Sequence, residues 1–228
     1  MLVWGRRWVW YSAVVLLVVL IAAPCALAQG YAKQGFYLGL YVPYNSVSDE
    51  DFDGTSYLTD EEADVLVLVP EVDSALGLGI ALGYRFSKAS VEINYLWSNH
   101  DAEWSHNGLI ATGDEAELSI FNLDGRYYFN TADAVQPFLY GGINITTLTA
   151  KDFAADASGP DDAEYHGAGI NFGGGVAFYI TPQFALNGTL YYRYVTMTSL
   201  DAAGESGSLD DDMDASSVNL MVGASFTF

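Results

Sequence analysis

Basic residues are scarce in this sequence of 228 residues. Only 8 Lys and Arg stand against 29 Asp and Glu, which gives a formal net charge of −21, although just 16% of the residues are charged. A surface with this charge repels phosphate groups, so we expect no nucleic-acid partner. The hydrophobic share of 51% excludes a chain that is disordered because it cannot form a core.

Long apolar runs are absent except near the N-terminus. There, Arg6 and Arg7 precede an uncharged run over residues 8–23, and Ala26-Leu27-Ala28 has the small-x-small pattern of a signal peptidase site. We therefore predict a signal peptide over residues 1–28 that is cleaved after Sec-type export. A retained membrane anchor is the alternative, but the run is short for a spanning helix.

Cysteine occurs once, at Cys25, inside the predicted signal peptide. The predicted mature domain, residues 29–228, then has no cysteine. This excludes disulfides, thiol catalysis and a cysteine metal site in the mature domain.

Helical periodicity is also missing from the predicted mature domain, where apolar residues instead recur at every second position. In residues 76–86, for example, Leu, Ile, Tyr and Phe alternate with Gly, Ala and Arg85. We predict eight strands with this pattern, over residues 36–42, 76–86, 91–97, 121–129, 137–145, 170–180, 184–194 and 218–228. A secreted β-sandwich is one fold that such strands can build.

Three features favour a membrane barrel over a sandwich. The bulky residues share one face of each strand, whereas the other face holds small and paired polar groups, as a narrow, filled lumen requires. Aromatic residues gather near strand ends, as in interfacial girdles. Short connectors alternate with long ones at about 45–73, 98–114, 150–166 and 196–216, as in outer-membrane barrels.

The chain resembles the small eight-stranded outer-membrane barrels of the OmpA-type and opacity-like class. The resemblance covers nearly the whole mature chain and rests on Tyr37-Leu38-Gly39, the LDGRYYF segment at 123–129, the VQPF segment at 135–138, and a last strand that contains Phe226 and ends at Phe228. It implies an all-β fold, an eight-stranded antiparallel up-and-down transmembrane β-barrel with short periplasmic turns and long acidic external loops. It also implies residence in the outer membrane of a Gram-negative bacterium, with both termini periplasmic.

The resemblance implies partners as well. Outer-membrane lipid and lipopolysaccharide would surround the barrel, which we expect to be a monomer. In the family, the last strand is the signal read by the barrel-assembly machinery. Phe226 and Phe228 are the residues that would carry this signal here.

Charged residues also fall on the small-residue face of the predicted strands: Arg85, Glu92, Asp124, Arg126 and Arg193. A two-residue turn at Lys88-Ala89 would place Arg85 directly across from Glu92. Because the interior of an eight-stranded barrel is just wide enough for side chains to fill, we expect a polar cluster that plugs the lumen. A gate or narrow pore for small solutes is the alternative.

Of the 29 acidic residues, 26 lie in or beside the predicted external loops. Within residues 49–60, acids occupy positions 1, 3, 5 and 12 and a glycine occupies position 6, which is close to the calcium-loop pattern. The candidate ligands are Asp49, Asp51, Asp53 and Asp60. The pattern departs from the calcium loop at Ser56 and in having Asp rather than Glu at its end, and an acidic loop that only solvates the surface is the alternative. We predict no cofactor apart from this candidate Ca²⁺.

These features together predict a structural or surface protein whose loops contact divalent cations or a partner from the host or the envelope. A lipid-modifying enzyme is a further alternative, because some small barrels act on lipid A. The three histidines, His100, His106 and His166, lie in predicted loops, and the deacylase pattern of His and Ser two apart on an outward strand face is missing. We therefore expect no enzymatic activity.

Overall fold

The computed structural model describes residues 30–46, 57–60, 65–68, 71–106, 109–156, 159–202 and 205–228. Its strands are β1 (Gly35–Asn45), β2 (Tyr57–Asp60), β3 (Val65–Leu68), β4 (Glu71–Val72), β5 (Ala75–Arg85), β6 (Ala89–His106), β7 (Leu109–Tyr128), β8 (Val135–Asp156), β9 (Gly159–Tyr179), β10 (Phe184–Ala202) and β11 (Glu205–Thr227). No helix in these ranges has the length and apolar character needed to cross a membrane. The predicted signal peptide lies outside the described residues.

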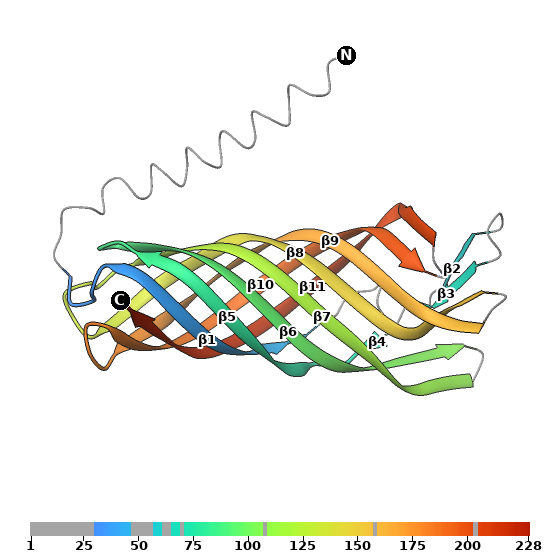
Figure 1. The fold of residues 1–228 in the computed structure, drawn as a ribbon, viewed down its shortest axis with the longest axis horizontal. Coiled ribbons are helices and arrows are strands. Elements are labelled where there is room, and N and C mark those ends of the chain that lie inside the picture. The colour runs from blue at the N-terminus through green and yellow to red at the C-terminus, as the bar shows by residue number, and fades with distance from the viewer. Residues whose placement is uncertain are drawn as a thin grey trace, which may run out of the picture.

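Eight long antiparallel strands form a closed barrel in the order β8-β7-β6-β5-β1-β11-β10-β9, and β9 pairs back onto β8 (Figure 1). Each long strand contains one of the predicted segments to within one residue, so the predicted fold class is confirmed. Closure pairs the backbone groups of every long strand with both neighbours, as a strand in lipid requires.

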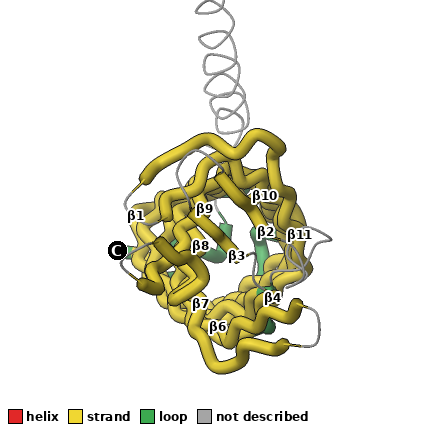
Figure 2. Tube along the Cα trace, turned by 90° about the vertical axis from the view of Figure 1, so that its right-hand side faces the viewer, coloured by secondary structure: helices red, strands yellow, loops and turns green. Residues whose placement is uncertain are grey.

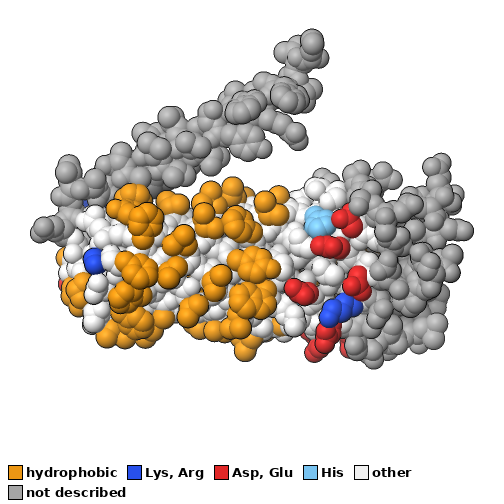
Figure 3. Space-filling model, in the orientation of Figure 1, with side chains coloured by type: hydrophobic (Ala, Val, Ile, Leu, Met, Phe, Trp, Pro, Cys, Tyr) orange, Lys and Arg blue, Asp and Glu red, His pale blue; other side chains and the backbone are white. Residues whose placement is uncertain are grey.

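The pleat of each strand separates two kinds of side chain. On β5, Leu78, Ile80 and Leu82 point outward and are 52–54% exposed, whereas Ala81 and Arg85 between and after them are buried. The outward residues of all eight strands form an apolar belt around the barrel (Figure 3). This is the orientation that the bulky face of the alternation predicts for strands in lipid.

The strands are longer than the sequence predicts. The predicted loops at 98–114, 150–166 and 196–216 are mostly paired extensions of β6–β7, β8–β9 and β10–β11 that continue beyond the apolar belt. We call these extensions the external hairpins. Apolar alternation ends at the belt because residues beyond it face water, while small inward residues such as Ala102 and Ala116 remain buried.

The external mouth is crossed by the connector between β1 and β5. Its strand β3 pairs with the tip of β8, through Leu66 opposite Ala155, and its strand β4 pairs with β6, through Val72 opposite Ala102. Because β8 is four strands away from β1 in either direction around the barrel, the described strands β2 and β3 of this connector lie across the opening from β1 (Figure 2).

The opposite mouth, where the short turns lie, is crossed by residues 30–34. The Tyr31 amide donates to the Thr131 carbonyl in the β7–β8 turn, and the Lys33 amide donates to the Pro182 carbonyl in the β9–β10 turn, each over 2.7 Å. These bonds hold the segment under the barrel before it enters β1 on the other side.

Candidate functional site: the polar lumen

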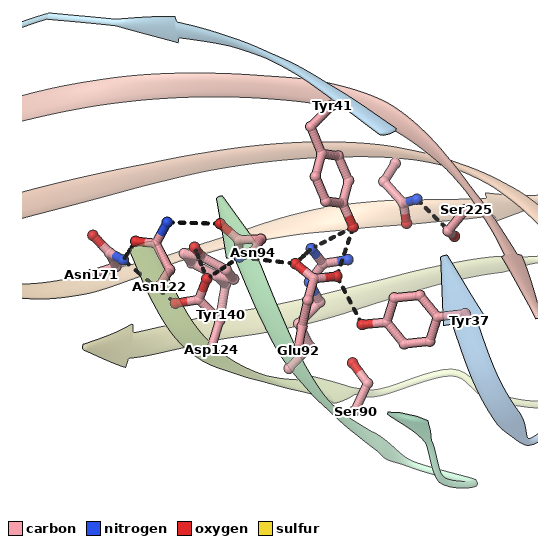
Figure 4. A network of polar contacts seen from close by, with 12 residues as sticks. Tyr37, Tyr41, Ser90, Glu92, Asn94, Asn122, Asp124, Tyr140, Asn171 and Ser225 are labelled. Atoms are coloured by element: carbon pink, nitrogen blue, oxygen red, sulfur yellow. Dashed lines mark hydrogen bonds and ion pairs between the residues drawn. The ribbon is translucent and has the colours of Figure 1, made fainter. Parts of the chain in front are cut away.

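An ion pair lies at the centre of the lumen. Arg126 on β7 donates to Glu92 on β6 over 3.0 Å, and both side chains are at most 1% exposed. The hydroxyls of Tyr37 and Tyr41 on β1 donate to the other carboxylate oxygen of Glu92 over 2.8 and 2.7 Å (Figure 4). The carboxylate is therefore bound to a cation and two phenols in a buried site.

A second carboxylate, that of Asp124, is bound only by neutral donors. Asn94 and Tyr140 each donate to one of its oxygens over 2.7 Å. Amide side chains extend the chain of bonds, from Asn171 to Asn122 over 2.8 Å and from Asn122 to Asn94 over 2.7 Å. The network thus joins strands β1, β6, β7, β8 and β9 across the interior.

Arg85 lies nearer the turns and does not contact Glu92, so the predicted pairing of these two residues is wrong. Its guanidinium carbon lies 3.3 Å from the centre of the Tyr128 ring, and it donates to Gln136 over 2.7 Å. Opposite it on β6 is Ser90, while Glu92 lies opposite Gly83.

The cause of this error is the position of the turn. The Phe86 amide donates to the Ala89 carbonyl over 2.8 Å, so the two turn residues are Ser87 and Lys88, one position earlier than expected. Moving a two-residue turn by one position moves the strand register by two. Arg85 still faces inward, but toward a different neighbour.

The fifth predicted residue, Arg193 on β10, is 3% exposed and lies apart from this network. It donates to the Tyr191 hydroxyl over 2.8 Å. All five charged residues predicted for the lumen are thus buried in the interior. The sequence reasoning missed the uncharged partners, the buried tyrosines and asparagines, although their position in the alternation places them on the same inward face.

His100 forms a short chain of contacts near the external mouth. Its Nε2 lies 2.8 Å from the Ser98 hydroxyl, and its Nδ1 contacts the Asp73 carbonyl in the connector after β4. Ser98 also accepts from Asn45 on β1 over 3.1 Å. Burial lowers the pKa of His100 from its ordinary 6.5. Ser98 and His100 are both buried, and the pair joins the connector to the barrel wall.

The external hairpins carry acids on their outer face, directly beyond the apolar belt (Figure 3). Three pairs of acids lie directly opposite each other on neighbouring strands: Glu71 and Glu103, Asp101 and Glu115, and Glu164 and Asp201. We call these six residues the acidic rim.

The cations near the acidic rim are few. Lys151 is the sole lysine or arginine between Arg126 and Arg193, and it donates to Glu115 over 2.8 Å. This contact lowers the pKa of Glu115 and raises that of Lys151. His166 lies 3.2 Å from Asp201 and 3.8 Å from Glu164.

Of the predicted calcium ligands, Asp49, Asp51 and Asp53 lie outside the described residues. Asp60 ends strand β2. The calcium loop therefore stays a prediction.

The predicted assembly residues lie at the turn end of the barrel. Phe226 on β11 is paired with Leu38 on β1 and Phe184 on β10. The Phe228 amide donates to the Phe36 carbonyl over 2.8 Å, and its ring lies 5.4 Å from that of Phe226. Both rings are exposed on the apolar belt.

Comparisons with known proteins agree with this architecture. A family model described as outer membrane protein beta-barrel domain matches residues 13–226. The chain is similar in structure to the outer membrane protein OprG from Pseudomonas aeruginosa, with a TM-score of 0.55 and 18% identity over 88% of this chain and 99% of that one. It is also similar to Neisserial surface protein A, with a TM-score of 0.50 and 15% identity over 85% of this chain and 97% of that one. No curated protein sequence matches the chain.

Proposed function

Since the chain belongs to the outer membrane protein beta-barrel domain family and resides in the Gram-negative outer membrane, we propose that its barrel is a closed stem for an acidic, cation-binding surface. The acidic rim lies where the barrel leaves the apolar belt, which is the level of the lipopolysaccharide head groups. In this proposal, divalent cations bound at the rim are shared with lipopolysaccharide and help to hold the envelope together.

The observation that carries the proposal is the arrangement of the rim acids in opposed pairs. Like charges directly opposite each other on neighbouring strands destabilise a sheet. Lys151 offsets the charge of Glu115 but leaves Asp101 across from it without a basic partner among the described residues. A hard divalent cation bridging such carboxylates would remove the repulsion, and oxygen ligands are those that Ca²⁺ and Mg²⁺ prefer.

The closed lumen argues for a stem rather than a pore. The contacts of Glu92, Arg126 and Asp124 cross the interior, and segments of the chain cross both mouths. Single-channel recordings in planar bilayers test this part, and we expect no stepwise conductance. Regular conductance steps from the heat-modifiable, folded protein would refute the closed stem and favour the narrow pore.

Binding to vesicles that contain lipopolysaccharide tests the cation-dependent surface. We expect Mg²⁺ to increase the association of the detergent-folded protein with these vesicles and chelation to reverse it. The variant Asp101→Asn should lower this dependence, whereas the matched control Asp133→Asn, which changes an acid in the β7–β8 turn, should not. If both variants lower the Mg²⁺ dependence equally, the binding results from the net charge of the protein and the rim site is refuted.

The calcium loop at residues 49–60 is a separate part of the proposal. Its acids at alternate positions, the central glycine and a final carboxylate favour a Ca²⁺ site with a dissociation constant on the order of 0.1–1 mM. Calcium titration of the folded protein should show saturable binding that weakens when Asp51 and Asp53 are both changed to Asn. A double variant that binds like the parent would refute the loop site.

A further inference from the structure

Arg193, like Arg85, is a buried lumen cation that forms no ion pair with a described carboxylate, and it also lines a cavity. Its guanidinium is a cation, and its side chain is 3% exposed. The phenol of Tyr191 accepts one of its hydrogen bonds, and the ring of the same residue lies 5.5 Å from the guanidinium carbon. Its Nε has no hydrogen-bond partner, and no described carboxylate forms an ion pair with it.

This arrangement is unfavourable for the protein alone. A charge buried without a counter-charge keeps most of its desolvation penalty. Arg126 shows the usual solution in the same barrel, since it is bound to Glu92. Arg85, without an ion pair, lies against the Tyr128 ring and donates to Gln136. Arg193 lies beside a cavity instead, and an anion there would offset its desolvation penalty.

A cavity of about 20 Å³ lies beside Arg193. On the same scale a water molecule needs roughly 10–15 Å³, so the space holds one small particle and excludes a sulfate, a phosphate or a lipid head group. Leu118, Leu148 and Met197 form apolar walls around it. Apolar walls reduce screening, which strengthens the attraction between the guanidinium and an anion.

The polar lining of the cavity offers donors. Ser217 accepts a hydrogen bond from Asn219 over 2.8 Å, which leaves its own proton to donate into the cavity. Thr146 uses its proton toward Asn144 over 3.0 Å. No Asp or Glu lines the cavity. One cation, one free hydroxyl proton and apolar walls are the features of a site for a small anion.

We propose that this cavity binds one monatomic anion, chloride in ordinary media, as the counter-ion of Arg193. The anion accepts hydrogen bonds from the guanidinium and from the Ser217 hydroxyl. It fills the cavity in the barrel core. Since the site exists in the folded barrel, chloride binding should stabilise the fold. This site is independent of the acidic rim, which binds cations outside the barrel.

Equilibrium unfolding in urea, followed by tryptophan fluorescence of the protein in detergent, tests the site. Ionic strength is held constant while chloride replaces gluconate, which is too large for the cavity. The folded-to-unfolded ratio should rise with chloride by the factor 1 + [Cl⁻]/Kd, or about elevenfold at ten times Kd. A ratio that does not change with chloride would overturn the proposal.

Two variants remove the site in different ways. Arg193→Met removes the charge, and Ala215→Val fills the cavity but keeps Arg193. Each should abolish the dependence on chloride, and Ala215→Val gives the answer if Arg193→Met fails to fold. The control Lys151→Met, which removes one positive charge from the outer surface, should keep the dependence of the parent. Chloride stabilisation that survives in a folded variant of either kind would place the anion elsewhere and refute this site.

Discussion

The central ion pair of the lumen allows a quantitative test of the closed stem. Glu92 accepts hydrogen bonds from Arg126, Tyr37, Tyr41 and Asn94, and its side chain is fully buried. The substitution Glu92→Gln keeps the size of the side chain but removes its charge. Arg126 then stays buried without its counter-ion. The amide NH2 group of the new Gln also takes the place of a carboxylate oxygen, although the groups around it are hydrogen-bond donors.

The expected cost follows from this loss. Breaking a buried ion pair by removing one partner typically costs about 3–5 kcal/mol of the free energy of unfolding. Since each 1.36 kcal/mol is a factor of ten, Glu92→Gln should shift the unfolding equilibrium by at least about a hundredfold. The double variant Glu92→Gln/Arg126→Met leaves no unpaired charge at this place and should recover part of the loss, because replacing both partners of a buried pair is often neutral.

Reversible urea unfolding from lipid vesicles measures the single variants Glu92→Gln and Arg126→Met and the double variant. The matched control is Glu117→Gln, an exposed glutamate on the outer face of β7, which should change the free energy of unfolding little. A loss below about 1 kcal/mol in Glu92→Gln, or a double variant whose loss is the sum of the two single losses, would refute the reasoning. The lumen network would then not be a cooperative plug.

Two other residues give sharp expectations. Deleting Phe228 or changing it to Asp should lower the amount of heat-modifiable barrel in the outer membrane far more than it lowers synthesis of the protein, because the ring contributes to the apolar belt at the turn end. The control is Phe228→Leu, and normal assembly of the Asp variant would contradict a role of Phe228 as assembly signal. Burial lowers the pKa of His100, so the unfolded chain binds a proton at this residue more readily than the folded barrel does. The contribution of neutral His100 to the free energy of unfolding should be full above about pH 6.5 and fall as the pH drops below it. His100→Gln should remove that part of the pH dependence, and an unchanged profile would show that His100 does not cause it.

The sequence predicts well which way a side chain points. Period-two alternation decides whether a residue faces lipid or lumen, and lipid imposes a strong penalty on the wrong choice. Leu82 and Arg85, three positions apart, therefore fall on opposite faces in the sequence pattern and in the barrel. The same rule places all five predicted lumen charges inside.

The length of the strands is less predictable from the sequence, because the apolar alternation that marks a strand ends at the membrane surface. Beyond the apolar belt, the outward positions become polar and the inward positions are small, as in Ala102 and Ala116. The alternation continues in size rather than in hydropathy. Backbone pairing, such as that of His100 with Ala116, holds the external hairpins together where the apolar pattern has ended.

The contacts inside the lumen depend on register, which alternation does not determine. A shift of two residues keeps every side chain on its face but exchanges its neighbours, as it does for Arg85. One further signal was present in the sequence. The inner face of β5 carries Gly79 and Gly83. The ring of Tyr37 on β1 packs over Gly83, and the Cβ of Tyr41 lies beside Gly79. Glycines on the inner face of a strand leave room for the long side chains of a neighbouring strand, which can then reach the strand beyond it. This is how the two tyrosines of β1 contact Glu92 on β6 across β5, so repeated glycines on an inward face indicate contacts between strands that are not adjacent.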